Sequence, residues 1–367
     1  MYQFDKRIVM TLDAGGTNFV FSAMQANKEI VNAISLPSNA DNLPNCLQTL
    51  EDGFNQIKNL IQEQPVAISF AFPGPADYVN GIIGDLPNLK AFKGGVALGP
   101  FLQEKFGIPV FINNDGDLFA YGEAIGGIIP EINKKLEDAG SHKRFKNLLG
   151  ATFGTGFGGG VVTNGKLHIG DNGSGGDLWV FRHKKFRDCI TEESVGIAAI
   201  KRMYSEFSGD YTTVLTPKDI CEIAYEQREG NVEAAKKTFA EMGEEAGDTI
   251  AHAITLIDGL IVIGGGLTGA SEFFMPAFMA ELNGTIGKLD GEKFTRLQMK
   301  AYNLDDEKEL EDFLKGHSVM VNIPGTDKKV PYDSEKRIGI AVSKLGASKA
   351  INLGAYAYAL SQLGELE

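Results

Sequence analysis

The feature that most constrains the fold is a glycine turn that directly follows a short apolar run. Residues 8–12 are Ile-Val-Met-Thr-Leu, and they lead into Asp13-Ala14-Gly15-Gly16-Thr17-Asn18. The run predicts a buried strand, and adjacent glycines let backbone N–H groups approach an anion closely, with the Thr17 hydroxyl as a further donor. A carboxylate beside a phosphate requires a divalent cation between them, so Asp13 is predicted to lie on the Mg²⁺ side of such a site. The alternative is a tight hairpin turn, without a ligand, between strands at 8–12 and 19–23.

Downstream of this turn, strand and helix patterns alternate. Apolar runs at 66–72 and 109–112 predict buried strands, and apolar residues at helical spacing cover 46–62 and 98–106. This alternation is typical of a mostly parallel sheet with helices on its faces. A later apolar run, 148–153, echoes the start of the chain because it too leads into a glycine-rich turn.

Length and charge limit the class of protein. A chain of 367 residues exceeds one ordinary hydrophobic core, so we expect one lobe at 1–122 with a C-terminal helix at about 350–367, and a second at 123–349. The net charge of −13 argues against non-specific binding to nucleic acid or to an anionic membrane. The three cysteines are widely spaced, and we find neither a long apolar segment nor a basic leader, so the cytoplasm is the expected compartment.

The second glycine turn, Gly154-Thr155-Gly156-Phe157-Gly158-Gly159-Gly160, contains the pattern GxGxxG. A dinucleotide-binding motif needs a helix directly after the turn, but residues 161–167 predict a hairpin around Asn164-Gly165. Residues Gly160 to Lys166 nearly match a Walker A motif, but the match fails at Leu167, where the motif needs a hydroxyl. The residues therefore favour a strand–turn–strand loop rich in N–H donors, which suits the β- and γ-phosphates of ATP.

Two further motifs follow apolar strands. Asn114-Asp115 comes after 109–112, and an acid at the carboxyl end of a parallel strand points into the crevice where ligands bind. Asp115 would take the proton from a sugar hydroxyl while Asn114 holds neighbouring hydroxyls, or either residue only caps the next helix. Gly264-Gly265-Gly266 follows 260–263 and either lets an adenine lie against the backbone or is a plain strand–helix turn.

The order of these motifs resembles the ROK family of sugar kinases and repressors, within the actin/hexokinase-like superfamily. The resemblance runs from Leu12 to about Ala270. It is carried by the motif DxGGT at Asp13–Thr17, a PGP turn at 73–75, Pro87-Asn88, Asn114-Asp115, GTGxGGG at 154–160, and Asp258 with 261–266. The resemblance implies a two-lobed, ribonuclease-H-like α/β fold with the active site in the cleft between the lobes.

The resemblance also implies roles for individual residues. Asp115 would be the general base, and Asp13 would position Mg²⁺ through water. ATP would be bound by residues of the three glycine motifs: Asp13, Gly15, Gly16, Thr17, Asn18, Gly154, Thr155, Gly156, Gly158, Gly264, Gly265 and Gly266. The sugar would be bound by Asn88, Asn114, Asp115, Asp177 and Glu192, with Glu193 as the alternative to Glu192.

One stretch departs from the family pattern, in which a GExGH segment and a CxCGxxGCxE run bind zinc. Asp177 here stands in place of Glu, Trp179 in place of Gly and Val180 in place of the zinc-binding His. Tetrahedral zinc needs four N or S ligands, which His183 and Cys189 cannot supply, so we expect no structural zinc. The changes leave the identity of the sugar open, since Trp179 or His183 would reshape the wall of its site.

These features favour ATP-dependent phosphorylation of a hexose or N-acetylhexosamine by a homodimer, with Mg²⁺ as the cofactor. A lobe hinged near 122 and 350 would close over the sugar and exclude water. The alternatives are a sugar-sensing regulator with weak or no kinase activity and a kinase for a non-sugar acceptor. ROK repressors carry a helix-turn-helix segment before the first motif, and the twelve residues before Asp13 are too few for one. We therefore expect neither direct nucleic-acid binding nor membrane binding.

Overall fold

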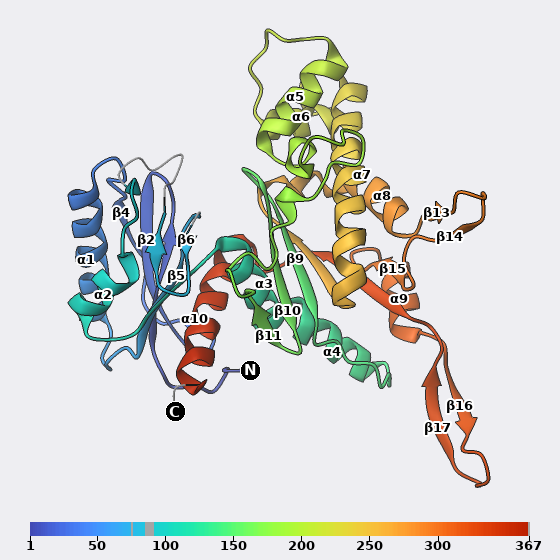
Figure 1. Cartoon of the computed structure of the whole chain (residues 1–367), viewed down its shortest axis with the longest axis horizontal. Coiled ribbons are helices and arrows are strands. Elements are labelled where there is room, and N and C mark those ends of the chain that lie inside the picture. The colour runs from blue at the N-terminus through green and yellow to red at the C-terminus, as the bar shows by residue number, and fades with distance from the viewer. Residues whose placement is uncertain (75, 85–91, 366–367) are drawn as a thin grey trace. The chain divides into compact units, whose positions relative to one another are not determined.

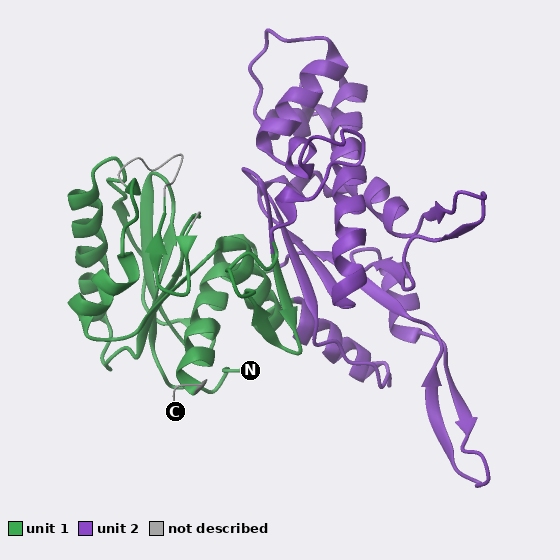
Figure 2. Cartoon of the chain, viewed as in Figure 1, with its two compact units in different colours: residues 1–127, 160–176, 345–367 green, residues 128–159, 177–344 purple. Residues whose placement is uncertain are grey.

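The computed structural model describes residues 1–74, 76–84 and 92–365, and the chain divides into two compact units. Unit 1 contains residues 1–127, 160–176 and 345–367, and unit 2 contains residues 128–159 and 177–344 (Figure 2). Residues 160–176 thus group with the first unit although they follow the second glycine turn. The lobe boundaries expected at 122 and 350 stay a prediction.

Unit 1 is built on a six-stranded sheet of order β3-β2-β1-β5-β8, with β4 paired to β2 (Figure 1). The strands are β1 (Val9–Ala14), β2 (Asn18–Gln25), β3 (Lys28–Glu29), β4 (Ile34–Pro37), β5 (Ala67–Ala71) and β8 (Val110–Asn113). Strands β1, β5 and β8 are parallel, and β2 runs antiparallel to β1. The parallel strands therefore end at one edge of the sheet, and the short hairpin β6 (Ala76–Asp77) and β7 (Ile82–Ile83) follows β5.

Successive residues of a strand point to opposite faces of the sheet, and the strands of this sheet carry apolar residues on both faces. Helices therefore cover it. Helix α1 (Leu43–Leu60) begins at Asn42, whose side chain accepts a hydrogen bond from the Asn45 N–H, and it buries Leu50, Phe54 and Ile57. Phe54 packs in one cluster with Leu12 and Phe70 of the sheet and with α2 (Leu98–Phe106).

Helix α10 (Ala347–Glu365) packs against β1 and β5 and against helix α3 (Asp115–Gly126). The two helices meet through glycines: a Cβ on Gly122 would overlap the carbonyl oxygen of Ala350, and a Cβ on Gly354 would overlap that of Leu118. The close approach explains why glycines stand in the middle of both helices despite their low helix propensity.

Unit 2 contains most of a second six-stranded sheet, of order β11-β10-β9-β12-β18-β15. The strands are β9 (Leu148–Phe153), β10 (Phe157–Thr163), β11 (Lys166–His168), β12 (Leu260–Gly264), β15 (Lys300–Asn303) and β18 (Arg337–Val342). Strands β9, β12, β18 and β15 are parallel, and β10 and β11 form the hairpin predicted around Asn164-Gly165. The chain passes from unit 2 to unit 1 within β10, after Gly159.

The helices of unit 2 pack around α7 (Val232–Ile257), which buries Phe239, Met242 and Ile250. The others are α4 (Ile128–Asp138), α5 (Ile197–Ser208), α6 (Pro217–Ala224), α8 (Ser271–Leu282) and α9 (Glu307–Lys315), with short 3₁₀ turns η2 (Leu178–Val180), η3 (Thr191–Ser194) and η4 (Gly266–Ala270). Two hairpins, β13 (Thr285–Gly287) with β14 (Lys293–Thr295) and β16 (Ser318–Asn322) with β17 (Lys329–Asp333), extend from unit 2 (Figure 1). Among the described helices, none has the length and apolar composition needed to cross a membrane.

The two units share one local plan. In unit 1 residues 15–17 join β1 to the antiparallel β2, and in unit 2 residues 154–156 join β9 to β10 in the same way. Each first strand is then flanked on its other side by a parallel strand, β5 or β12. The echo between the two glycine turns in the sequence is thus an echo in topology.

Candidate active site

The first candidate region is the turn between β1 and β2. Asp13 is half-buried at the end of β1, and Gly15, Gly16, Thr17 and Asn18 are exposed. Ser38 is buried beneath the turn: its hydroxyl donates to the Gly16 carbonyl at 2.7 Å, and its N–H donates to the Thr17 carbonyl at 2.9 Å. Because these carbonyls are bound to Ser38, the turn is held in place with its glycine edge toward solvent. Sequence reasoning missed Ser38, which no motif marks.

The second candidate region is the start of α3. Asp115 is the first residue of the helix and is exposed. Asn114 caps the helix, since its Oδ1 accepts a hydrogen bond from the Asp117 N–H at 2.6 Å and its Nδ2 donates to Asp117 Oδ2 at 3.0 Å. The capping alternative therefore holds for Asn114, although its amide nitrogen carries a second N–H. Sequence reasoning missed Asp117, which lies three residues after the capping Asn114 and is buried.

Strand order brings Asp13 and Asp115 to one edge of the unit 1 sheet. Leu12, Phe70 and Ile112 lie side by side on β1, β5 and β8, and Asp13 and Asp115 follow the first and the last of them. Two strand spacings separate β1 from β8, so the ends of these two strands lie about 10 Å apart at the carboxyl edge. Ligands of α/β proteins bind at this edge. Asn88, predicted to bind the sugar, lies outside the described residues.

The third candidate region is the turn between β9 and β10. The Gly154 N–H donates to the Gly156 carbonyl at 3.1 Å, and Glu192 Oε2 accepts the Phe157 N–H at 2.7 Å. A Cβ on Gly156 would overlap that carboxylate oxygen, so only glycine fits there. Strand β10 follows the turn directly, so the dinucleotide-binding and Walker A alternatives, which need a helix, are wrong.

The fourth candidate region, Gly264-Gly265-Gly266, lies beside the third. Gly264 pairs with Thr152 in the parallel ladder of β12 and β9. Gly265 has a φ of +95° and no room for a Cβ, which would overlap the Phe153 carbonyl. The turn leads through η4 into α8, so it is also the strand–helix turn of the alternative interpretation. Within unit 2 the structure thus brings the turns 154–156 and 264–266 together at one sheet edge.

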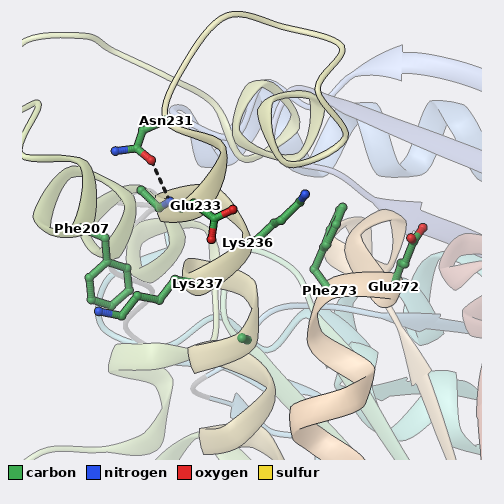
Figure 3. Close-up of a pocket in the computed structure, with 9 residues that line it drawn as sticks. Phe207, Asn231, Glu233, Lys236, Lys237, Glu272 and Phe273 are labelled. Atoms are coloured by element: carbon green, nitrogen blue, oxygen red, sulfur yellow. Dashed lines mark hydrogen bonds between the residues drawn. The ribbon is translucent and has the colours of Figure 1, made fainter.

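A cavity of about 630 Å³ lies between α5, α7 and the start of α8 (Figure 3). Lys237 stands 4.1 Å from the centre of the Phe207 ring, and Phe273 and Glu272 line the α8 side. The volume lies within the range of about 300–1,000 Å³ that is typical of small-molecule pockets. The cavity therefore has room for a ligand the size of a nucleoside.

The segment that departs from the family pattern has two different parts. Asp177 is half-buried before η2, and Trp179 is exposed. His183, in contrast, is buried: its Nε2 is 2.8 Å from Ser194 Oγ, and its Nδ1 accepts the N–H groups of Lys185 and Phe186 at 3.0 and 3.2 Å. His183 therefore does not form an exposed wall of a sugar site. The sequence had left this role open for it.

The donor set of this segment does not fit the zinc that the family pattern implies. Both ring nitrogens of His183 are engaged within the protein, and Cys189, whose backbone carbonyl accepts the His183 N–H at 3.0 Å, has an exposed free thiol. In the described part of the chain, no three His, Cys, Asp or Glu side chains are grouped so that they could hold a metal. That the protein contains no zinc stays a prediction, which metal analysis of the purified protein tests.

The fold and these sites define a chain with two α/β units, each presenting a glycine turn at the carboxyl edge of its sheet. Residues 9–301 match the ROK family, and the chain belongs to this family. Its fold is that of the ROK sugar kinases, the actin/hexokinase-like fold, as the sequence predicted.

Individual relatives are sugar kinases. The crystal structure of a glucokinase from Parabacteroides distasonis ATCC 8503 is 58% identical, with a TM-score of 0.90, and the match covers 98% of this chain and 99% of that one. An N-acetyl-D-glucosamine kinase of Vibrio vulnificus is 32% identical over 168 residues, 45% of this chain and 50% of the relative. A glucokinase of Thermotoga maritima is 27% identical over 281 residues, 71% of this chain and 82% of the relative. The match to the Vibrio kinase thus spans half of that relative.

Proposed function

We propose that the chain is a kinase that transfers the γ-phosphate of ATP to a hydroxyl of a hexose or N-acetylhexosamine. The observation that carries the proposal is the exposed Asp115 at the same sheet edge as Asp13 and its glycine turn. The 58% identity to a glucokinase over nearly the full length supports a sugar as the acceptor. Which sugar and which hydroxyl react are questions for the assay below.

Asp115 acts as the general base in this proposal. Its carboxylate accepts the hydroxyl proton while the hydroxyl oxygen attacks the γ-phosphorus, and the bond from that phosphorus to the β–γ bridging oxygen breaks to release ADP. Such a base typically contributes a factor of about 10²–10⁴ in rate. The second N–H of Asn114, together with Asn88, Asp177 and Glu192, would hold the other hydroxyls of the sugar.

Asp13 would hold Mg²⁺ through water. Mg²⁺ is usually bound by one or two carboxylates together with waters and substrate phosphates, and a single half-buried acid at the end of β1 fits that pattern. When bound, Mg²⁺ supplies neutralisation of the charge on the β- and γ-phosphates.

The glycine turns would bind the nucleotide. The Thr17 hydroxyl with the backbone of Gly15, Gly16 and Asn18, and the backbone of Gly154 to Gly158, would donate hydrogen bonds to the phosphates. The Gly264–Gly266 turn would lie against the adenosine. The tying of these turns by Ser38 and by Glu192 supports the assignment, because preorganised donors lose no energy to reorganisation when the ligand binds.

The test is ADP formation from ATP and Mg²⁺ with glucose, mannose, fructose, allose, N-acetylglucosamine or N-acetylmannosamine, beside a control without sugar. We expect ADP formation that depends on one class of sugar and stops when EDTA removes the Mg²⁺. Sugar binding without turnover would instead support a sugar-sensing regulator. Turnover with none of the sugars, and no sugar binding, would favour a non-sugar acceptor.

A further inference from the structure

A buried polar cluster joins the segment 183–194 to helix α7. Its members are all at least 98% buried: His183, Thr191, Ser194, Glu245 and Thr249. Glu245 Oε1 accepts the Lys184 N–H at 2.9 Å and the Thr191 hydroxyl at 3.2 Å, and the Thr191 and Thr249 hydroxyls are 2.7 Å apart. Neither the proposed chemistry nor any sequence motif accounts for this cluster.

The hydrogen bonds fix where the protons of the cluster lie. His183 Nδ1 accepts two backbone N–H groups, so it carries a lone pair, and Nε2 carries the hydrogen that Ser194 Oγ accepts. Glu245 Oε2 is 3.3 Å from that same Nδ1. An ionised carboxylate would repel the ring lone pair at this distance, so the neutral form of the buried carboxyl group is favoured. Oε1, which accepts two hydrogen bonds, is then the carbonyl oxygen of a neutral carboxyl group.

We propose that a neutral Glu245 beside the unprotonated Nδ1 of His183 acts with this ring, through Thr191 and Ser194, to hold Glu192 against the Gly154–Gly158 turn. Thr191 and Ser194 are the first and last residues of η3, and Glu192 lies between them. Glu192 in turn accepts the Phe157 N–H, and the Ile197 N–H donates to the Gly154 carbonyl at 3.0 Å. The cluster therefore fixes the turn 154–158. Only the role of this turn in binding phosphate rests on the proposed function.

The cluster takes the place of the metal that anchors this segment in the family pattern. Zinc would tie the loop together through ligands within it. Here Thr191 and the Lys184 N–H instead bind a side chain of α7, a helix 26 residues long whose middle is buried. The attachment of this segment to α7 therefore depends on the protonation of Glu245 and not on a bound metal. His183 and Glu245 are positioning residues, because they touch neither the proposed sugar nor the nucleotide.

Charged groups around the pair set its response to pH. Burial, with a smaller contribution from the nearby Asp248, raises the pKa of Glu245 to about 7, and the hydrogen bonds from Lys184 and Thr191 oppose this rise. Burial lowers the pKa of His183. The groups that face His183 from the loop, α5 and α7 are Lys185, Glu193, Arg202 and Glu241. Above a pH of about 7 the ionised carboxylate would face the ring lone pair, and the contact would weaken.

Hydrogen–deuterium exchange of the segment 153–160, corrected for the intrinsic effect of pH, tests the proposal without relying on catalysis. At one unit above the Glu245 pKa about ten molecules are ionised for each neutral one, so protection should fall about tenfold from its value one unit below the pKa. Glu245→Gln, whose side chain is neutral at every pH, should remove this fall. The matched control Glu244→Gln changes a half-buried neighbour on α7 that pairs with Lys184 and Lys185, and it should behave as the wild type.

Thr191→Val keeps the shape of the side chain and removes both hydroxyl bonds, so it should lower protection of 153–160 at either pH. The proposal is overturned when Glu245→Gln keeps the wild-type pH dependence, or when Thr191→Val leaves protection unchanged.

As a kinetic readout, the KM for ATP should rise above pH 7 in the wild type but not in Glu245→Gln. A protein that forms no ADP with any sugar would contradict the proposed function, while the exchange result would still decide on the cluster.

Discussion

At the scale of single residues, neighbours in the sequence have different tasks. Asn114 is largely occupied in capping α3. The next residue, Asp115, is exposed, and its Oδ1 accepts the Gly116 N–H at 3.0 Å within the first turn of the helix. The cap fixes the direction in which the helix begins, and the helix places the acid. The structure therefore separates a residue that positions from a residue that is available for chemistry.

Asp115→Asn should lower the turnover of the sugar kinase by a factor of about 10²–10⁴, because the amide cannot accept the hydroxyl proton. Binding of ATP and sugar should stay close to that of the wild type, since size and hydrogen-bonding reach are kept. Steady-state kinetics and calorimetric binding measure the two effects. A mutant with wild-type turnover would show that Asp115 is not the base, and Asp138→Asn, on the exposed side of α4, is the control.

The stability of the protein should vary with pH in a way that the His183–Glu245 pair determines. Between pH 4.5 and 6.5, the unfolded chain holds a proton on His183 and the folded chain holds one on Glu245. Both states therefore bind one proton, and the pair does not make the free energy of unfolding depend on pH in this range. Above 6.5 only the folded state keeps its proton, so stability falls as pH rises through the Glu245 pKa of about 7. Below 4.5 the unfolded state binds both protons, so stability falls as pH falls.

Urea unfolding across this pH range measures the prediction. Glu245→Gln should lack the loss near pH 7, because glutamine is neutral in both states, and should instead lose stability as pH falls below 6.5, where only His183 titrates. The assigned protonation of Glu245 would be contradicted if the stability of the wild type did not decline through pH 7. It would also be contradicted if Glu245→Gln showed the same decline.

At the scale of elements, glycines decide how closely helices and turns approach. Gly122 and Gly354 bring the backbones of α3 and α10 together, Gly156 admits the Glu192 carboxylate, and Gly265 admits the end of β9. These positions share one physical cause, since a Cβ at each would enter a volume already filled by backbone or by a bonded carboxylate. These four glycines therefore serve the close contact between elements.

Gly354→Ala should destabilise the protein by about 1–3 kcal/mol or more, because the added methyl would push α10 off α3. Gly364→Ala is the matched control: it lies in the same helix with open space around it, so it should leave stability unchanged or raise it slightly. Thermal unfolding of the two variants provides the comparison. Equal stability of both would mean that the packing of α3 on α10 tolerates a separation of the helices.

At the scale of the whole molecule, the chain assigns its two sets of proposed site residues to different units. Asp13, its glycine turn and Asp115 belong to unit 1, and the Gly154–Gly158 turn, Glu192 and Gly264–Gly266 belong to unit 2. Closure of one lobe over the sugar, about positions near 122 and 350, stays a prediction, as does the homodimer, which light scattering in solution tests.

Ligands should stabilise the whole protein by mass action. A sugar that is the true acceptor, at about 100 times its dissociation constant, should raise the free energy of unfolding by about 2.7 kcal/mol, and a non-substrate sugar should leave it unchanged. A non-hydrolysable ATP analogue with Mg²⁺ should add its own increment. Thermal shift measurements over the sugar panel provide the test, and equal shifts for every sugar would contradict a specific sugar site.

The sequence alone determined the local features: the glycine turns, the strands that precede them and the hairpin at Asn164-Gly165. These depend on backbone freedom and on periodicity within a few residues, which the order of amino acids encodes directly. The tertiary structure alone revealed Ser38 under the first turn, 22 residues beyond Gly16, and Glu245 beside the segment around Lys184, 61 residues away. It also decided the pairing of β15 with β18 and the grouping of residues 160–176 with unit 1. Contacts of this kind are made by packing between distant segments, and no local pattern records which segment will supply the partner.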